Sequence, residues 1–436
     1  PNATDNSRIS SLYDMCVDAT VQNFATRPVA EPIPAEHMRE IVARLPVELD
    51  PRITAVSVFD ENYWKRCCIE RFGWHHCHLV EHGLTWKRLF FETYAQECLE
   101  SLQADEGKED EGKGGEGKGS EDPLDEVLEL LKVCQDYIFT LTVKQLPSHP
   151  DMERVLALLP NLSKLELSYG VGKCGMNYER MMFGMKISDA NHLSRALMVT
   201  PNLTTLVLQG NLIDDDLLRM LTTGLINNES ITHLDMSHNK ITNHGIRLLA
   251  KLMGKDSVLT CLNLADNQLH AESGRYLGHG LRTNDSIVDL NLRLNRLTDV
   301  GGHLLLQGLA ANDTLERLNL SANDLASDTC SALAAVLKSD RGQSTPPLSS
   351  VDLSCNRLGS DDVVILKNAL LNNSTLTNLD LRMNPDIGED AKKNHRRDQR
   401  RDSQERTGRA FLRPLFVSND LVAADVSSHL KERRRP

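Results

Sequence analysis

The sequence predicts an α/β solenoid of 28-residue units, preceded by a small, mainly helical domain. One observation is a recurring motif, L-x-x-L-x-L-x-x-N, in which Ile, Val or Met replaces some leucines; successive motifs begin 28 residues apart, except for one interval of 33. A second is a pair of apolar residues, four positions apart, that follows the first six motifs. Such a period is typical of solenoids. The motifs begin at Leu203, Ile231, Leu259, Ile287, Leu315, Leu348 and Leu376.

Each motif predicts a short strand followed by a turn. The alternation within x-L-x-L-x places the leucines on one face of the strand and the intervening residues on the other. The Asn stands where the chain leaves the strand, and its amide can both donate and accept hydrogen bonds. We therefore expect a structural ladder of Asn side chains that satisfies backbone groups inside the turns. The ladder residues are Asn211, Asn239, Asn267, Asn295, Asn323, Asn356 and Asn384.

The second half of each unit is predicted to be helical. Apolar pairs such as Leu277 and Leu281 form one face of a helix. Asp214, Thr242 and Thr298 stand where helix N-caps are expected. A strand and a full helix within 28 residues resemble the ribonuclease-inhibitor type of leucine-rich repeat, which implies a curved α/β solenoid.

Composition divides the chain into six segments. All three tryptophans lie within residues 37–104, which predicts a compact helical domain with a small core of its own. The charged, Gly-rich stretch that follows predicts a disordered linker, and the next helix is expected to cap the solenoid. The predicted segments are an extended N-terminal segment (1–36), the helical domain (37–104), an acidic and Gly-rich linker (105–122), a capping helix with a degenerate first repeat (123–161), the leucine-rich repeats (162–390) and a basic C-terminal tail (391–436).

Outward-facing strand residues line the concave face of the predicted solenoid. They are mostly Asn or Asp in the middle column, and three arginines stand among them as possible anchors, since Arg is enriched at binding hot spots. Solenoids typically bind partners on this face; alternatively, short polar side chains only solvate it. The protein-binding candidates are Gln209, Asp235, Asn263, Asn291, Arg293, Arg317, Asn319, Asp352, Asp380 and Arg382.

An insertion interrupts the period near residues 168–184. The step from Leu162 to Leu203 is 41 residues, and the excess is rich in Gly and Met. Met-rich loops suit adaptable contacts, and a poorly ordered insertion is the alternative. The binding candidates here are Met176, Tyr178, Met181 and Met182.

Charge and cysteine usage restrict the partners. A net charge of −12 argues against nucleic acid as a partner, and no apolar run approaches the roughly 18 residues that span a membrane. Ten scattered cysteines predict free thiols in a reducing compartment, and hence a soluble intracellular protein. We interpret most N-x-[ST] sequons as part of the repeat, because they recur at one phase of it. The sequence begins Pro-Asn-Ala, which leaves open whether the natural N-terminus is present.

The basic tail, 391–436, holds 13 Lys/Arg against 6 Asp/Glu. It predicts docking onto an acidic filament surface or a neighbouring subunit. Nuclear localisation, nucleic-acid binding and a merely solvated tail stay open, although aromatic residues of the kind that single-strand binders use are not interleaved.

The sequence predicts neither an enzyme nor a cofactor. Phosphate-binding, nucleophile-elbow and zinc-protease motifs are absent from the sequence. Three cysteines and four histidines cluster between residues 67 and 82, but no CxxC pair accompanies them, so zinc is not expected.

The segments ENYWKRCCIERFGW (61–74) and WKRLFFETY (86–94), followed by an acidic linker and the repeats, resemble one family in particular. The resemblance is to the T-complex-associated testis-expressed protein 1 family, the leucine-rich-repeat subunit of the nexin–dynein regulatory complex in motile cilia and flagella. It implies a non-catalytic scaffold in the axonemal cytoskeleton that links neighbouring doublets and regulates dynein-driven sliding. The implied partners are other subunits of that complex, coiled-coil ones included, and the doublet surface.

Two alternatives stay open. LPVEL (45–49) with the Trp-containing segments resembles an F-box that precedes leucine-rich repeats, which would imply a substrate adaptor of a ubiquitin ligase. Ran-type GTPase activators also use such repeats, but typically carry an acidic tail, whereas this chain ends with a basic one.

Overall fold

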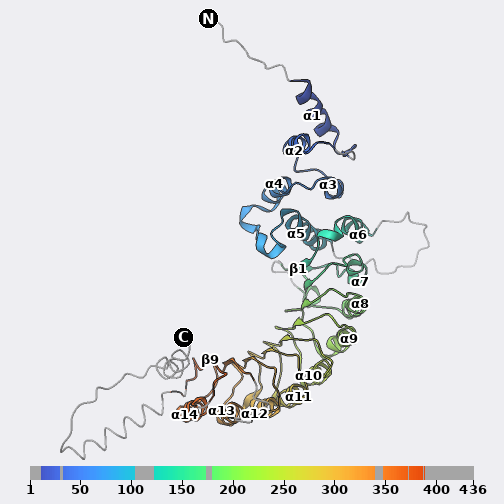
Figure 1. Cartoon of the computed structure of the whole chain (residues 1–436). Helices are drawn as coiled ribbons and strands as arrows, with labels where there is room; N and C mark the ends of the chain where they lie inside the picture. The colour runs from blue at the N-terminus through green and yellow to red at the C-terminus, as the bar shows by residue number, and fades with distance from the viewer. Residues whose placement is uncertain are drawn as a thin grey trace, which may run out of the picture. The chain divides into compact units, whose positions relative to one another are not determined.

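The computed structural model describes residues 11–29, 33–103, 122–172, 179–338, 347–371, 373–385 and 387. The chain divides into two compact units, residues 1–165 and 166–436, and each is described here by itself. Figure 1 labels their α-helices and the first and last strands, β1 and β9. The basic tail, almost all of the predicted linker, and both Met176 and Tyr178 lie outside the described residues.

The first unit is mainly helical. A polar N-terminal segment with several prolines led us to expect an extended chain over residues 1–36, and between Leu12 and Asn23 this expectation is wrong, because these residues form a helix. Val17 is buried on this helix and Phe24 just after it, and the Arg44 guanidinium forms ion pairs with Asp14 (3.0 Å) and Asp18 (2.8 Å). The elements are α1 (Leu12–Asn23), α2 (Ala35–Arg44), α3 (Pro51–Ser57), α4 (Glu61–Phe72), η1 (Trp74–His76), η2 (Leu79–His82), α5 (Trp86–Ser101), α6 (Pro123–Cys134), η3 (Gln135–Tyr137), β1 (Thr140–Leu146) and α7 (Met152–Leu156).

An aromatic cluster forms the core between α4 and α5. The Trp64 side chain is fully buried and donates from Nε1 to the Val58 carbonyl at 3.1 Å. Its ring lies 4.9 Å from that of Phe91, a usual separation for packed aromatic pairs. This core contains Trp64, one of the chain's three tryptophans.

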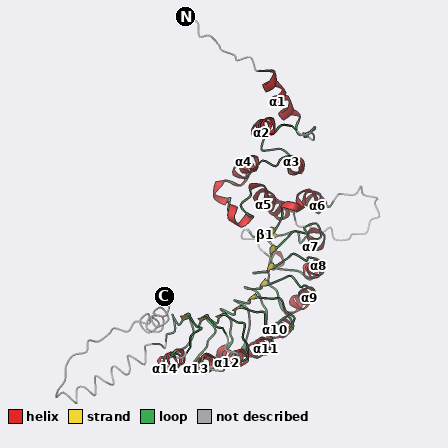
Figure 2. Cartoon of the chain, in the orientation of Figure 1, coloured by secondary structure: helices red, strands yellow, loops and turns green. Residues whose placement is uncertain are grey.

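The second unit is a leucine-rich-repeat solenoid of the α/β class. From β3 onward the strands pair in parallel with aligned repeats, so that Leu262 lies between Leu234 and Leu290. The helices cover one side of the strands and leave the other, concave side open (Figures 1 and 2). The strands are β2 (Lys164–Tyr169, shared with the first unit), β3 (Thr205–Val207), β4 (His233–Asp235), β5 (Cys261–Asn263), β6 (Asp289–Asn291), β7 (Arg317–Asn319), β8 (Ser350–Asp352) and β9 (Asn378–Asp380).

The helical half of the repeat varies more than the strand half. Helix α10 ends at Leu249, so Met253 is buried beyond the helix that was expected to include it. The helices are η4 (Arg180–Met182), α8 (Ile187–Leu197), α9 (Asp215–Ile226), α10 (Asn243–Leu249), α11 (Ala271–Leu281), α12 (Thr298–Leu309), α13 (Ser327–Leu337) and α14 (Ser360–Leu370).

Of the three predicted N-caps, Asp214 and Thr242 cap their helices through side-chain oxygens, whereas Thr298 does not. Thr298 is the first residue of α12 and has a left-handed backbone, with φ of 57°. Helices α11 and α12 pack backbone against backbone here, since a Cβ on Gly274 would lie 2.0 Å from the Gly301 carbonyl oxygen. We attribute the altered start of α12 to this close approach.

Among the helices that the structure describes, none combines the length and the apolarity needed to cross a membrane.

Candidate functional site

The Asn ladder joins each repeat to its neighbours. Asn267 is 7% exposed, and its Nδ2 donates to the carbonyls of Met236 (3.0 Å) and Leu264 (3.1 Å). Its Oδ1 accepts from the Ile241 amide at 3.1 Å. One side chain therefore satisfies backbone groups of two repeats at the point where both leave the sheet. All seven ladder residues are buried.

The residue immediately before each ladder Asn has a left-handed backbone, which the sequence analysis did not identify. This left-handed column turns the chain after the strand, and each of its first six amides donates to a carbonyl of the next repeat, as Asp266 does to Arg293 at 2.8 Å. Only Gly adopts this conformation without steric cost. The residues share no side-chain chemistry that could reveal it: Gly210, His238, Asp266, Leu294, Ala322, Cys355 and Met383.

The predicted polar column on the concave face lies at the last residue of strands β4 to β9. We call it the strand-end column. In each case Oδ1 accepts from the backbone amide two residues later, at distances between 2.8 and 3.1 Å. This contact satisfies an N–H group that has just left the strand, so the repeated Asn or Asp has a structural role that the sequence analysis did not identify. The members are Asp235, Asn263, Asn291, Asn319, Asp352 and Asp380.

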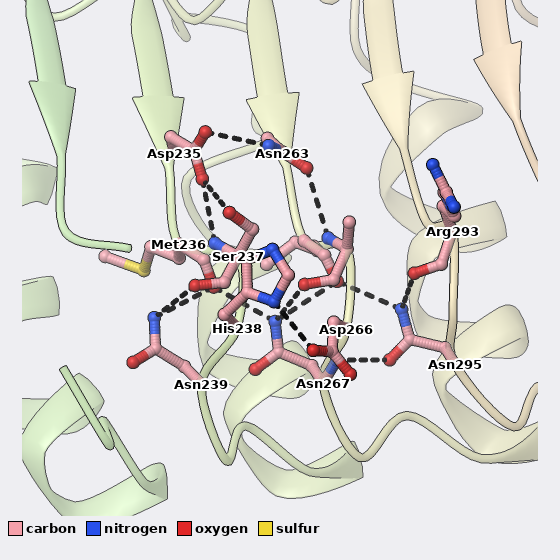
Figure 3. A network of polar contacts seen from close by, with 12 residues as sticks. Asp235, Met236, Ser237, His238, Asn239, Asn263, Asp266, Asn267, Arg293 and Asn295 are labelled. Atoms are coloured by element: carbon pink, nitrogen blue, oxygen red, sulfur yellow. Dashed lines mark hydrogen bonds and ion pairs between the residues drawn. The ribbon is translucent and has the colours of Figure 1, made fainter. Parts of the chain in front are cut away.

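Two members of the strand-end column also bond to each other. Asn263 Nδ2 donates to Asp235 Oδ2 at 2.7 Å, as Figure 3 shows. Next to them, His238 Nδ1 and Asp266 Oδ2 lie 2.7 Å apart between consecutive members of the left-handed column. The concave face around β4 and β5 is therefore a continuous polar network rather than a set of independent side chains.

The three candidate arginines differ in their pairing. Arg317 Nε donates to Asp289 Oδ2 at 2.7 Å, and Arg382 Nε donates to Asp380 at 3.0 Å. Arg293 is exposed, and its side chain forms no hydrogen bond or ion pair within the described residues. In Figure 3 its guanidinium extends away from the polar network. Arg293 is thus the candidate anchor best placed to receive a carboxylate from outside.

The remaining candidates lie near the start of the second unit. Gln209 is exposed just beyond β3. Met182 is 38% exposed at the end of η4, and nothing is described of the Met181 side chain. The ends of the insertion lie together, because the Val171 amide donates to the Met182 carbonyl at 3.0 Å.

A second set of amides holds the turns that precede the strands, and it explains most of the sequons. Asn312 is 1% exposed; its Nδ2 donates to the carbonyls of Leu281 (2.8 Å) and Asn284 (2.9 Å). Its Oδ1 accepts from the amides of Thr314 (3.1 Å) and Leu315 (2.9 Å). A buried amide with this many partners is a structural group. Equivalent turns are held by Asn228, Asn284 and Asn373.

Asp256 occupies this amide position in one repeat and cannot donate from its carboxylate. A cavity of about 350 Å³ lies beside it, lined by apolar groups such as Leu225 and Val258 and by charged ones such as Glu229 and Lys255. The cavity therefore coincides with the interruption of the second amide set and with the short helix α10.

In the first unit, the buried carboxylate of Glu92 connects α5 to the start of β1. It accepts from the amides of Phe139 (2.8 Å) and Thr140 (2.7 Å) and from Arg88 Nε at 2.8 Å, and it also contacts His82. The side chain is 1% exposed. Four partners compensate for the burial of the charge.

Lys87 is the second buried charged group of this unit, with 4% exposure. Its Nζ donates to the carbonyls of Ala55 (2.6 Å) and Val58 (2.9 Å) and lies 4.2 Å from the centroid of the Tyr137 ring. Burial lowers the pKa of Lys87 to about 8.

The cysteine and histidine cluster of this unit does not form a site. Cys67 and Cys68 are buried, and burial raises the pKa of both thiols. Within the part of the chain that the structure describes, no group of three or more Cys, His, Asp or Glu side chains is placed to hold a metal ion.

The fold and its two sets of amides define a leucine-rich-repeat protein. The family described as Leucine Rich repeat matches residues 227–250 and 255–278. Among solved structures, an internalin from Listeria monocytogenes is similar over 60% of this chain and 70% of its own, with 18% identity and a TM-score of 0.35.

More specific similarity is found to dynein regulatory complex subunit 5. The protein of that name from Chlamydomonas reinhardtii is 37% identical over 217 residues, which are 49% of this chain and 50% of the relative. The one from Mus musculus is 32% identical over 245 residues, which are 50% of this chain and 46% of the relative. The chain thus spans about half the length of the curated relatives it matches.

Proposed function

We propose that this protein is a non-catalytic scaffold subunit of the dynein regulatory complex in the axoneme of motile cilia and flagella. The observation that carries the proposal is the similarity to dynein regulatory complex subunit 5, at 31–37% identity over about half of the chain. In this function the protein resides in the axonemal cytoskeleton and contributes to the link between neighbouring doublets, where it restrains dynein-driven sliding. The name T-complex-associated testis-expressed protein 1 stays an expectation from the sequence.

The concave face supports a binding role. One oxygen of each strand-end residue is engaged by a turn contact, so exposed side chains beyond the strand ends, such as Arg293 and Gln209, add to the surface that a partner would contact. Partners would be other subunits of the complex, coiled-coil ones included, and the doublet surface. Solenoids commonly use their concave surface in this way.

Affinity purification of the tagged full chain from salt-extracted axonemes tests the function. We expect the other subunits of the regulatory complex to co-purify in comparable amounts. Co-purification of a ubiquitin-ligase adaptor subunit with residues 37–104, without axonemal partners, would favour the F-box alternative. Stimulation of GTP hydrolysis by the purified chain would contradict the non-catalytic assignment.

A further inference from the structure

Arg293, Leu294 and Arg296 form a small cationic and apolar surface next to the concave face. We call it the Arg–Leu–Arg patch. It begins two residues after strand β6, and the buried ladder residue Asn295 separates Leu294 from Arg296. All three side chains of the patch are exposed, Leu294 to 43%.

The two arginines of the patch are without side-chain partners among the residues that the structure describes. Neither Arg293 nor Arg296 forms a side-chain hydrogen bond or ion pair with any described residue. By contrast, Arg357, which occupies the position of Arg296 two repeats later, pairs with Asp324 at 3.1 Å. Both patch arginines can therefore donate bidentate hydrogen bonds to carboxylates of another molecule.

Leu294 is held in an unfavourable backbone conformation without being buried. It belongs to the left-handed column, with φ of 56°. On one side its column neighbour Asp266 pairs with His238, and on the other Ala322 offers only a methyl group. Glycine would fit this turn better, so the fold does not account for a large apolar side chain here.

We propose that the Arg–Leu–Arg patch binds an acidic segment of a partner protein, in which carboxylates flank an apolar side chain. Charge complementarity favours this occupant, because the patch presents two cations that pair with no described residue, one on each side of an exposed leucine in the sequence. The apolar side chain of the segment packs on Leu294, while its carboxylates bind Arg293 and Arg296. The inference rests on the proposed function only for the identity of the partner, another subunit of the complex.

Variants separate the binding role of Leu294 from any structural one. Leu294→Gly removes the apolar side chain and relieves the left-handed backbone, so the solenoid should unfold at the same temperature as the wild type or higher. Ala322→Gly, at the same position of the next repeat, relieves the backbone without removing a large side chain and is the matched control. For the cations, Arg293→Gln and Arg296→Gln are compared with Arg357→Gln, which alters an arginine already paired within the fold.

The direct test uses the full chain and a fluorescent peptide that contains Glu-Glu-Leu-Glu-Glu, measured by fluorescence anisotropy. We expect salt-sensitive binding that weakens about tenfold in Arg293→Gln/Arg296→Gln and about fivefold in Leu294→Gly, with Ala322→Gly and Arg357→Gln unchanged. Replacing the peptide's Leu by Ser should weaken binding to the wild type, and replacing its Glu by Lys should abolish it. Absence of binding to the wild type, or equal binding by all variants, overturns the proposal.

Three further measurements distinguish other occupants of the patch and separate a failure of the patch proposal from a failure of the proposed function. If the chain self-associates and the patch variants abolish this, the patch binds a second copy of the chain. If deletion of residues 104–121 tightens peptide binding, the patch binds the chain's own acidic segment. Either result overturns the proposal that the patch binds a partner protein. Rebinding to axonemes depleted of the protein is the third. Equal rebinding of wild type and variants contradicts the role of the patch but is consistent with the proposed function. Failure of the wild type to rebind contradicts the proposed function, and the peptide measurement alone then tests the patch.

Discussion

The side-chain amide of Asn267 donates to the carbonyl of Met236 at 3.0 Å and so joins two consecutive repeats inside the solenoid. Because the same amide also donates to Leu264, one side chain satisfies turns on both sides of a repeat boundary. A solenoid is stabilised mainly by such contacts between neighbours.

Asn267→Asp should therefore destabilise the second unit by about 2–4 kcal/mol, since a carboxylate cannot donate and would be buried without those partners. Urea unfolding followed by far-ultraviolet circular dichroism measures the change. Gln268→Ala alters the next, exposed residue and should stay within about 0.5 kcal/mol of the wild type. Equal stability of the two variants would mean that the ladder contributes little.

The second set of amides predicts effects of opposite sign at two equivalent positions. Asp256→Asn restores a donor where the repeat lacks one, and should stabilise the second unit by about 1 kcal/mol. Asn312→Asp removes two donated bonds at a buried site and should cost about 2–3 kcal/mol. The same urea titration tests both, and a loss of stability in Asp256→Asn would show that the turn beside the cavity is not an incomplete copy of the others.

Glu92→Gln should destabilise the first unit by about 3 kcal/mol, because it removes a buried carboxylate that Arg88 and two amides contact. Tryptophan fluorescence reports this unit selectively, since all three tryptophans lie in it. Glu97→Gln, which breaks an exposed pair with Arg71, should cost less than about 1 kcal/mol. Similar losses of stability in the two variants would argue against a stabilising role of the Glu92 contacts between α5 and the start of β1.

Lys87 predicts a pH dependence of the first unit. Burial holds its folded-state pKa at about 8, below the ordinary value of 10.5. Between these two values the unfolded chain binds a proton that the folded chain lacks, so this group makes the unit more stable as pH rises through the window. Burial raises the pKa of Tyr63 and Cys68, and these groups act in the opposite direction.

The Lys87 contribution is isolated by subtracting the stability of Lys87→Met from that of the wild type. The free energy of unfolding of the wild type should increase relative to that of the variant by up to about 3 kcal/mol between pH 7.5 and about 10.5. Tryptophan fluorescence in urea at several pH values measures it. A difference that is flat across the window would mean that Lys87 keeps its ordinary pKa despite burial.

The repeat period predicted the solenoid because leucines such as Leu262 and Leu290 must be buried in every unit, whatever stands between them. Helix α1 was not predicted, since Val17 is the one residue buried on it, and its contacts with Arg44 depend on a residue far along the chain. The altered start of α12 depends on the approach of Gly274 to Gly301, which residue types do not encode.

For the candidate site, residue type predicted which side chains are exposed on the concave face but not which of them form ion pairs. Arg293 and Arg317 are the same residue at outward positions, and only the neighbouring strand decides that Arg317 meets Asp289. The left-handed column could not be predicted either, because backbone conformation there is imposed by the turn. Leu294 and Ala322 therefore adopt it against their own preference.

Quantitative proteomics of motile axonemes, extracted in steps of increasing salt, tests whether the protein belongs to the dynein regulatory complex. We predict that the protein is present in intact axonemes and is released in the same salt step as other subunits of the dynein regulatory complex. Its absence from axonemes that retain the rest of that complex would contradict the account.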